Sequence, residues 1–471
     1  MIQDNDENEM VDYTAQREAL KQAPQDKRPE QEQSSPQKAT PLSPKRYQEK
    51  RAAQTPEDSS LDHTINIPAV QVYKKNNWSI EIPLVPTFTF ENMDMASNRF
   101  SHAAAMSLCE NVGSLYNPFF IYGDTGTGKT HFLNALGYDL SKKVPQDRIL
   151  ITNGVRFSRG VQRFVEEGQI DKLEKFFNNA EVLIIDDIHL TAVNDHNREF
   201  ISNLLNRFLK EKRQIIISSK YPPESLARFE ELVNFRLDQG WVSEMKPPRP
   251  QRLAKIYSKM VFDAELSLSD TQTQSYFGGT GINLGTVARN IRRVKVLNRK
   301  IIDSGVSSPG YDQLLGEMLG MTDDSRSKIV TKDVKEVLTL PRPLGTDWGR
   351  FGFFFPQDNT DKLNWVAFAI IERAKELGIK GGFRFTLKSS YSTNHLISAA
   401  FKIANICDDK NLKGAIILGP SGVGIAPAIR ENFYDILTHM LEVMMIRCAI
   451  IDPETIKRPS SYTKLLGDVL R

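Results

Sequence analysis

The sequence predicts an α/β fold class: a parallel sheet covered by helices, a helical lid, and a second, smaller α/β domain. Apolar runs alternate with helix-periodic segments between residues 80 and 222, which is typical of strand–helix–strand units. Helical periodicity without an obvious strand follows from residue 248. The α/β alternation resumes after PRPLG at 341–345, a linker signal.

The N-terminal segment differs in composition from the rest of the chain. It is rich in Gln, Glu, Lys, Asp, Pro and Ser, and it has few large apolar residues. Such a segment cannot bury enough apolar surface to offset the entropy lost on ordering. We therefore expect four parts: a disordered polar tail at 1–77, a sheet domain at 78–247, a helical lid at 248–340 and a small α/β domain at 341–471.

Four short apolar runs in the sheet domain read as buried parallel strands, at 118–123, 148–153, 181–187 and 213–219. Helical patterns separate them, at 130–140, 160–177 and 198–212. In the lid, one short helix is expected near 311–319 and another at 331–338. In the last domain we expect strands at 351–355, 383–387, 414–419 and 448–452, and helices at 361–377, 394–406 and 425–445.

Bulk composition restricts the functional classes. The 471 residues carry a formal net charge of +3, so nucleic-acid binding would have to come from local basic patches. The three cysteines are isolated, which argues against a disulfide framework or a zinc site and for a reducing cytoplasm. The start of the chain, MIQDNDENEM, is too polar for a signal peptide, and no apolar run approaches the roughly 18 residues of a membrane span.

The strongest motif is GDTGTGKT at residues 123–130, which matches the phosphate-binding pattern G-x-x-x-x-G-K-[ST] in full. It lies between a predicted strand and a predicted helix, where backbone N–H groups and the helix N-terminus can face phosphate oxygens. Lys129 should reach the β- and γ-phosphates of ATP, and the Thr130 hydroxyl should bind Mg²⁺. The predicted nucleotide-binding residues are Gly123, Asp124, Thr125, Gly126, Thr127, Gly128, Lys129, Thr130 and His131.

A second motif, VLIIDD at residues 182–187, places two acids at the end of a buried strand. Asp186 should hold the Mg²⁺ shell, and Asp187 should polarise the attacking water as a general base. The next strand ends in Ser218, Ser219 and Lys220, and a polar residue there can sense the γ-phosphate. Ordinary strand-end polarity is a nearly equal alternative for these three.

These motifs and their surroundings resemble the ATPase domain of the DnaA and Hda family of AAA+ proteins. The similar segments are residues 87–137 with the P-loop, KYPPE at 220–224, the lid helix at 283–294 and TKDVKEVL at 331–338. Together they span about residues 86–338. The resemblance implies a nucleotide-binding fold that assembles head to tail, with an arginine of one subunit completing the site of the next.

The resemblance carries over unevenly to individual residues. Arg236 falls on the arginine-finger position, whereas Leu232 stands where the family has a second arginine. Gly285 occupies the place of the lid sensor arginine, for which Arg289 could substitute one turn later. Lys220 replaces a sensor aspartate. We therefore expect ATP binding, with hydrolysis that is weak or dependent on a partner.

The sequence says less about contacts with DNA and about the last domain than about the nucleotide site. Arg156, Arg159 and Arg163 lie near one of the places where the family contacts single-stranded DNA, although a solvated helix face explains them equally well. Residues 341–471 show no helix-turn-helix signature. The glycine turn at 419–424 is better explained by packing than by anion binding, and His395 and His439 are interpreted as structural.

The predicted function is a nucleotide-dependent oligomeric switch in DNA replication initiation or its regulation, with ATP and Mg²⁺ as cofactors. Its expected partners are further copies of the chain, joined through Arg236, together with single-stranded or duplex DNA and other replication proteins. Two alternatives stay open. One is a regulatory adaptor that docks on an initiator or a clamp without binding DNA, and the other is an enzyme whose chemistry lies in the C-terminal domain.

Overall fold

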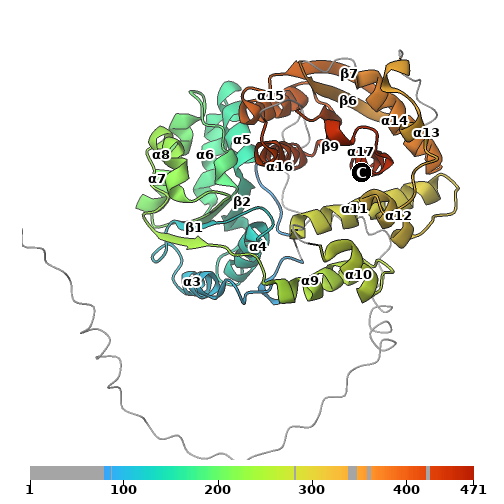
Figure 1. The fold of residues 1–471 in the computed structure, drawn as a ribbon. Helices are drawn as coiled ribbons and strands as arrows, with labels where there is room; N and C mark the ends of the chain where they lie inside the picture. Colours follow the sequence, from blue (N-terminus) through green and yellow to red (C-terminus); the bar gives the residue numbers. More distant parts are fainter. Residues whose placement is uncertain (1–78, 86, 280–282, 338–346, 358–361, 421–424) are drawn as a thin grey trace, which may run out of the picture. The chain divides into compact units, whose positions relative to one another are not determined.

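The computed structural model describes residues 79–85, 87–279, 283–337, 347–357, 362–420 and 425–471 (Figure 1). All of these residues belong to one compact unit. The tail predicted at residues 1–77 and most of the glycine turn at 419–424 lie outside them. No helix of the described residues is both long and apolar enough to cross a membrane.

The first sheet has five parallel strands in the order β2-β3-β4-β1-β5. Its strands are β1 (Phe119–Tyr122), β2 (Ile149–Asn153), β3 (Val182–Asp186), β4 (Gln214–Ser219) and β5 (Trp241–Glu244). The four predicted strands are confirmed, and β5 is an additional edge strand. Its four residues are only partly buried or exposed, so the short segment WVSE lacks the continuous apolar run of the inner strands.

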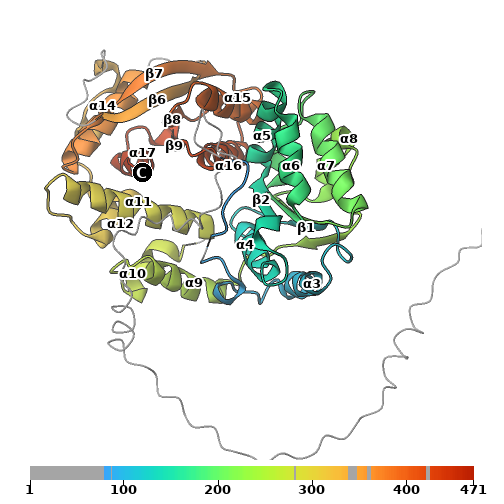
Figure 2. The same cartoon turned by 180° about the vertical axis from the view of Figure 1, so that it is seen from behind.

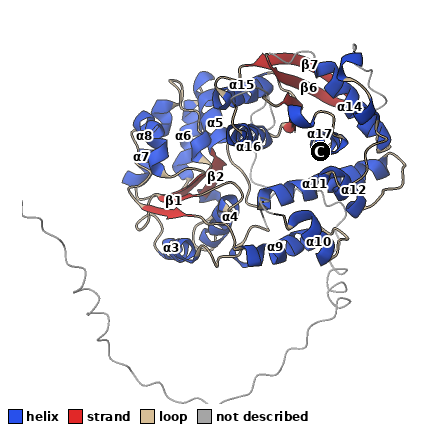
Figure 3. Ribbon diagram, viewed as in Figure 1, coloured by secondary structure: helices blue, strands red, loops and turns tan. Residues whose placement is uncertain are grey.

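Helices cover both faces of this sheet (Figure 3). They are α3 (Arg99–Glu110), α4 (Lys129–Leu140), α5 (Gly154–Glu166), α6 (Ile170–Asn179), α7 (Arg198–Lys210) and α8 (Ala227–Val233). The single helix predicted at 160–177 was wrong, because it is two helices. Gly168 between them has φ +66°, a left-handed conformation that ends α5 and that glycine adopts without strain.

The strand order brings three strand ends together at one edge of the sheet. Strand β4 lies between β1 and β3, with Tyr122 in register with Ser219 and Ile185 with Ile217. Because all three strands are parallel, their carboxyl ends meet at the same edge. The P-loop after β1, the acidic pair after β3 and the polar end of β4 are therefore neighbours.

The lid is helical, as predicted. It contains α9 (Pro250–Asp263), α10 (Asp270–Phe277), α11 (Leu284–Asp303), α12 (Tyr311–Leu319), α13 (Lys328–Thr331) and the 3₁₀ turn Val334–Glu336. A capping box at Ser269 starts α10, and the Asn283 side chain accepts from the Thr286 N–H to start α11. The helix predicted at 331–338 was wrong: Thr331 is the last residue of α13, Val334–Glu336 form the 3₁₀ turn, and residue 338 lies outside the described residues.

The C-terminal part is a second α/β unit with a parallel sheet, as predicted, and its strand order is β7-β6-β8-β9. Figure 2 labels its four strands. Its strands are β6 (Asp347–Pro356), β7 (Gly382–Tyr391), β8 (Gly414–Leu418) and β9 (Arg447–Ile451). Its helices are α14 (Lys362–Glu376), α15 (Leu396–Asp409), α16 (Pro427–Val443) and α17 (Pro459–Val469). Helix α17 is an element that the sequence patterns had not indicated.

This second sheet shares its hydrophobic cores with both neighbouring parts. On one face, Phe353, Ile416 and Leu465 pack in a continuous core with lid residues such as Val294 and Leu315. On the other face, α15 and α16 enclose a core that also contains Val155 of α5. Both views of the ribbon show α16 beside α5, and α17 beside the lid helices (Figures 1 and 2). The C-terminal domain therefore contacts the first sheet domain and the lid at once.

Candidate nucleotide site

The P-loop has the backbone shape that a phosphate-binding turn requires. Gly126 and Gly128 adopt φ +83° and +95°, and Gly128 is the residue from which α4 starts. A Cβ at Gly128 would lie 3.0 Å from Met93, and one at Gly126 would lie 3.1 Å from Asn283 at the start of lid helix α11. A side chain at either position would combine backbone strain with a tight contact.

The Lys129 side chain is buried inside this loop. Its Nζ donates hydrogen bonds to the carbonyl oxygens of Gly123 at 2.8 Å and Asp124 at 3.0 Å. The Thr127 hydroxyl donates to the same Asp124 carbonyl at 2.9 Å and closes the turn. The ammonium group is thus already held within the loop, where a triphosphate would supply stronger, charged acceptors.

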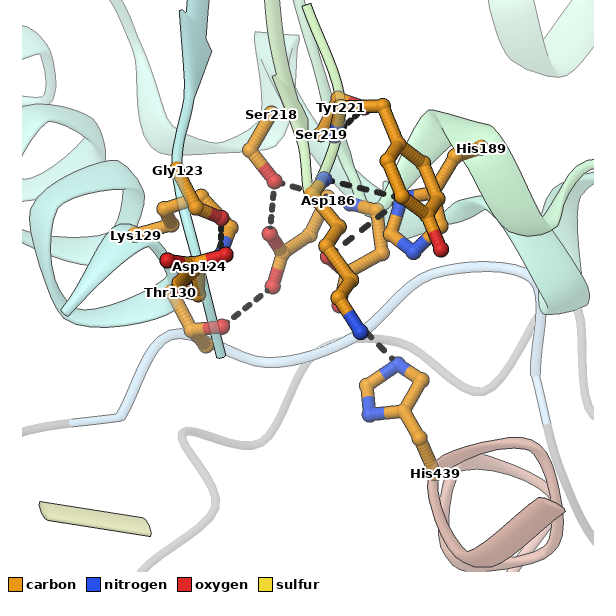
Figure 4. A network of polar contacts seen from close by, with 12 residues as sticks. Gly123, Asp124, Lys129, Thr130, Asp186, His189, Ser218, Ser219, Tyr221 and His439 are labelled. Atoms are coloured by element: carbon orange, nitrogen blue, oxygen red, sulfur yellow. Dashed lines mark hydrogen bonds and ion pairs between the residues drawn. The ribbon is translucent and has the colours of Figure 1, made fainter. Parts of the chain in front are cut away.

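A hydrogen-bond network joins the P-loop to the ends of β3 and β4 (Figure 4). Thr130 Oγ1 donates to Asp186 Oδ2 at 2.7 Å, and the Ser218 hydroxyl donates to Asp186 Oδ1. Ser218 Oγ in turn accepts the Asp187 N–H at 2.9 Å. Burial raises the pKa of Asp186, and the charge of the neighbouring Asp187 raises it further. The hydrogen bonds from the Ser218 and Thr130 hydroxyls lower it and so oppose that rise.

The oxygen atoms of Thr130 and Asp186 are of the kind that bind a magnesium ion. A hydroxyl and a carboxylate oxygen lie 2.7 Å apart beside the loop that would hold the phosphates. Mg²⁺ prefers hard oxygen ligands, and it completes its octahedron with water and substrate phosphates rather than with protein ligands alone. Thr130 and Asp186 would hold the ion, which supplies charge neutralisation for the phosphates.

Asp187 has histidines on both sides. Its Oδ2 lies 3.1 Å from Nε2 of His439 on α16, and its Oδ1 lies 3.8 Å from Nδ1 of His189. Burial lowers the pKa of His189 to about 3, and the next largest contribution comes from His439. His189 is therefore neutral at physiological pH, and its Nδ1 accepts the Lys220 N–H at 3.2 Å. Sequence patterns had singled out neither the His189 contact nor the approach of His439.

The sensor candidates at the end of β4 have separate partners. Ser218, not Ser219, is the hydroxyl bound to Asp186, while Ser219 Oγ accepts the Tyr221 N–H at 2.9 Å and stabilises the turn. Lys220 Nζ donates to Asn432 Oδ1 of α16 at 2.7 Å. The Lys220 ammonium group is therefore bound to the C-terminal domain.

Two further candidates hold neighbouring segments in place. His131 Nε2 lies 2.8 Å from the Thr89 carbonyl, and its ring stacks on Phe88 with 4.7 Å between centroids. It anchors the segment before α3 to helix α4. Arg289 lines a cavity of about 770 Å³ between the lid and the C-terminal domain, alongside Tyr434 and Cys448, and no P-loop residue lines that cavity.

The proposed finger residue, Arg236, lies at the surface with its side chain 67% exposed. Its guanidinium pairs with Asp238 at 2.7 Å and lies 3.6 Å from Glu230. The exposure leaves it accessible to a second copy of the chain, while the ion pairs hold it in one orientation.

The three arginines predicted to contact DNA lie against protein groups of the C-terminal domain in this structure. The expected solvent-facing basic path is therefore not observed at these residues. The Asp408 side chain on α15 is fully buried, and it binds both Arg159, at 2.8 Å, and Arg163. Arg156 Nε donates to the carbonyl of Val443, the last residue of α16, at 2.5 Å. Burial lowers the pKa of Arg156 to about 10. All three face the C-terminal domain rather than an open cationic path.

All three cysteines are free and buried, and among the residues that the structure describes no group of three or more His, Cys, Asp or Glu side chains could hold a metal ion. The magnesium site proposed above relies on one carboxylate, one hydroxyl and the phosphates of the nucleotide, so it does not need such a group.

Comparison with known proteins gives a consistent picture. The family model "Bacterial DnaA ATPase domain" matches residues 84–244. The chromosomal replication initiator protein DnaA of Neisseria gonorrhoeae is 27% identical over 256 residues, which cover 53% of this chain and 48% of that protein. The chain thus spans about half the length of this curated relative.

Two solved structures are similar to this chain. Domain III of DnaA from Thermotoga maritima is 26% identical, covers 50% of this chain and 97% of that one, and has a TM-score of 0.43. A replication initiator DnaA bound to AMPPCP and single-stranded DNA is 20% identical, covers 69% and 94%, and has a TM-score of 0.39. Residues 84–244 therefore match the DnaA ATPase domain, and the P-loop and the acidic strand end lie within the matched segment.

Proposed function

We propose that this chain is an ATP-binding switch that assembles with nucleotide and acts in DNA replication initiation or its regulation. One observation carries the proposal: Thr130, Asp186 and Ser218 form a single hydrogen-bonded network directly beside the P-loop. A structural glycine turn has no need for a buried carboxylate in contact with the loop, because burying that charge is unfavourable without a function or a counter-charge.

Each residue of the site has its own role in ATP binding. The backbone N–H groups of residues 123–130 and the N-terminus of α4 would hold the phosphates, while Lys129 exchanges its carbonyl acceptors for phosphate oxygens. Ser218 orients Asp186 through one oxygen, and Thr130 does so through the other. Asp187 would polarise the attacking water.

Hydrolysis by the isolated chain should be slow. Leu232 and Gly285 replace two arginines of the family pattern, so fewer cations are available to stabilise charge on the γ-phosphate. Arg236 would have to come from a second copy, since its side chain is exposed at the surface. If a second copy supplies Arg236 to the site, the copies should assemble when nucleotide binds, and this assembly can be measured.

Two measurements test the proposal. The first is equilibrium binding of labelled ATP to the full chain and to Lys129→Ala, for which we expect binding to be lost in the variant. The second is light scattering with ATP, with ADP and without nucleotide, for the wild type and Arg236→Ala. We expect a mass increase that needs ATP and Arg236; no ATP binding by the wild type would refute the proposal.

A second candidate function is a regulatory adaptor that docks on another replication protein without binding DNA. The contacts of Arg156, Arg159 and Arg163 with the C-terminal domain favour the adaptor, because these were the basic residues expected to contact DNA. Fluorescence anisotropy with single-stranded and duplex DNA at several salt concentrations distinguishes the DNA-binding switch from the adaptor. Affinity that falls steeply with salt supports DNA contact, and no binding at low salt supports the adaptor.

A further inference from the structure

Helix α16 of the C-terminal domain reaches the hydrolytic end of the nucleotide site. Asn432 Oδ1 accepts a hydrogen bond from the Lys220 ammonium group at 2.7 Å. On the same helix, His439, labelled in Figure 4, has its Nε2 3.1 Å from Asp187 Oδ2. The Tyr221 hydroxyl lies 3.4 Å from the same Asn432 oxygen. A single helix of another domain thus contacts two groups that have expected roles in hydrolysis, Lys220 through a hydrogen bond and Asp187 at 3.1 Å.

The two contacts come from the same face of α16. Asn432 and His439 are seven residues apart, which is close to two helical turns, so their side chains point in a similar direction. Phe433, Leu437 and Leu441 lie on the opposite side, buried in the C-terminal core. Helix α16 is therefore amphipathic, and Asn432 and His439 on its polar face contact the ATPase side.

Other contacts fix this helix at the ATPase domain. Arg156 lies at the carboxyl end of α16 and donates to the Val443 carbonyl, where a cation complements the helix dipole. On the neighbouring helix α15, Asp408 is enclosed by Arg159 and Arg163. These anchors are far from the P-loop in sequence and involve no nucleotide-binding residue.

We infer that α16 is a built-in inhibitory element of the ATPase: in the docked state it occupies Asp187 and Lys220, and turnover requires α16 to move away. The inference rests on the proposed function, since it concerns the same site. The His439 ring lies 3.1 Å from one oxygen of the Asp187 carboxylate, which leaves less room for an attacking water at that oxygen. A lysine bound to Asn432 points its charge at α16 instead of at a γ-phosphate.

The test measures steady-state ATP turnover and equilibrium ATP binding on the full chain. The variants are His439→Ala, Asn432→Ala and the double variant, with His395→Ala as a matched control, because His395 is an exposed histidine of the same domain. We expect several-fold higher turnover in each single variant, a larger increase in the double variant, an unchanged value in the control, and ATP affinity within about twofold of the wild type throughout.

A second variant acts from a distance. Asp408→Ala weakens the docking without touching Asp187 or Lys220, and we expect it to raise turnover as well, with hydrogen exchange across residues 427–443 accelerated. Turnover that is unchanged or reduced in His439→Ala, in a protein that unfolds at the wild-type temperature and binds ATP normally, overturns the inference. If the wild type fails to bind ATP, it is the proposed function that fails instead.

Discussion

Replacing Asp408 by asparagine should destabilise the chain far more than the same replacement at its neighbour Asp409. The Asp408 side chain has no exposed surface, and it lies between two guanidinium groups that are 10% and 8% exposed. Asp409 is 60% exposed, and it lies 2.9 Å from Arg159 and 3.8 Å from Arg163. The pair offers a buried and an exposed carboxylate in consecutive positions, in contact with the same two arginines.

The expected magnitudes follow from the burial of each charge. Removing one partner of a buried ion pair leaves an uncompensated buried charge, which costs about 3–5 kcal/mol. Here Asp409 retains part of the compensation for Arg159, so we expect about 3 kcal/mol for Asp408→Asn. An exposed pair contributes roughly 0–1 kcal/mol, and this is the range for Asp409→Asn.

Urea unfolding of the full chain, followed by circular dichroism and tryptophan fluorescence, measures both variants against the wild type. The C-terminal domain should separate from the ATPase domain at lower urea in Asp408→Asn, so the two probes should no longer coincide. Equal free energies of unfolding for the two variants would refute the reasoning. That result would mean the buried carboxylate contributes no more than the exposed one.

Three further predictions concern the nucleotide site and its surroundings. Ser218→Ala removes a donor to Asp186 and the acceptor of the Asp187 N–H, so unfolding should become easier by about 1–3 kcal/mol and turnover should fall; Ser219→Ala, which loses only a turn contact, is the control. Gly126→Ala forces a side chain into φ +83°, and ATP affinity should fall at least tenfold in a direct binding assay; normal affinity would contradict the P-loop geometry. Burial raises the pKa of Glu81 from 4.5 to about 7, so its stabilising protonated form is present at low pH and is lost as pH rises through 7. Glu81→Gln should thus raise stability at pH 8 by about 1–2 kcal/mol, an amount reduced for the partial exposure of the group, with little change near pH 4; equal effects at both pH values would exclude this ionisation.

Local patterns predicted the sheet domain well because its signals are local. The strands at 118–123 and 181–187 are continuous apolar runs, and burial on both faces makes such runs necessary in a parallel sheet. The P-loop was recognisable because one continuous segment carries all its chemistry. Edge strand β5 lacked a signal, since an edge strand is half-covered and its sequence needs no continuous apolar run.

Contacts between distant segments were beyond the reach of local patterns. Arg159 and Asp408 are 249 residues apart, and a cationic helix face looks the same in sequence whether it meets water, DNA or a buried carboxylate. His439 likewise lay on a helical pattern with no identifiable partner. Only the packing of α16 against the ATPase domain brings it to Asp187. Residue type specifies what a group can bind, and topology decides what it meets.

Two departures from the family pattern have a common explanation in this structure. One is Lys220, where the resemblance leads us to expect a sensor aspartate, and the other is the C-terminal α/β domain, which shows no helix-turn-helix signature. Asn432 of that α/β domain is the partner of Lys220. An aspartate at position 220 would lose this ammonium–amide hydrogen bond, and it would place a second carboxylate close to Asp187. The lysine therefore fits a chain in which α16 covers the site, and exchanging Lys220 and Asn432 together should preserve docking better than changing Lys220 alone.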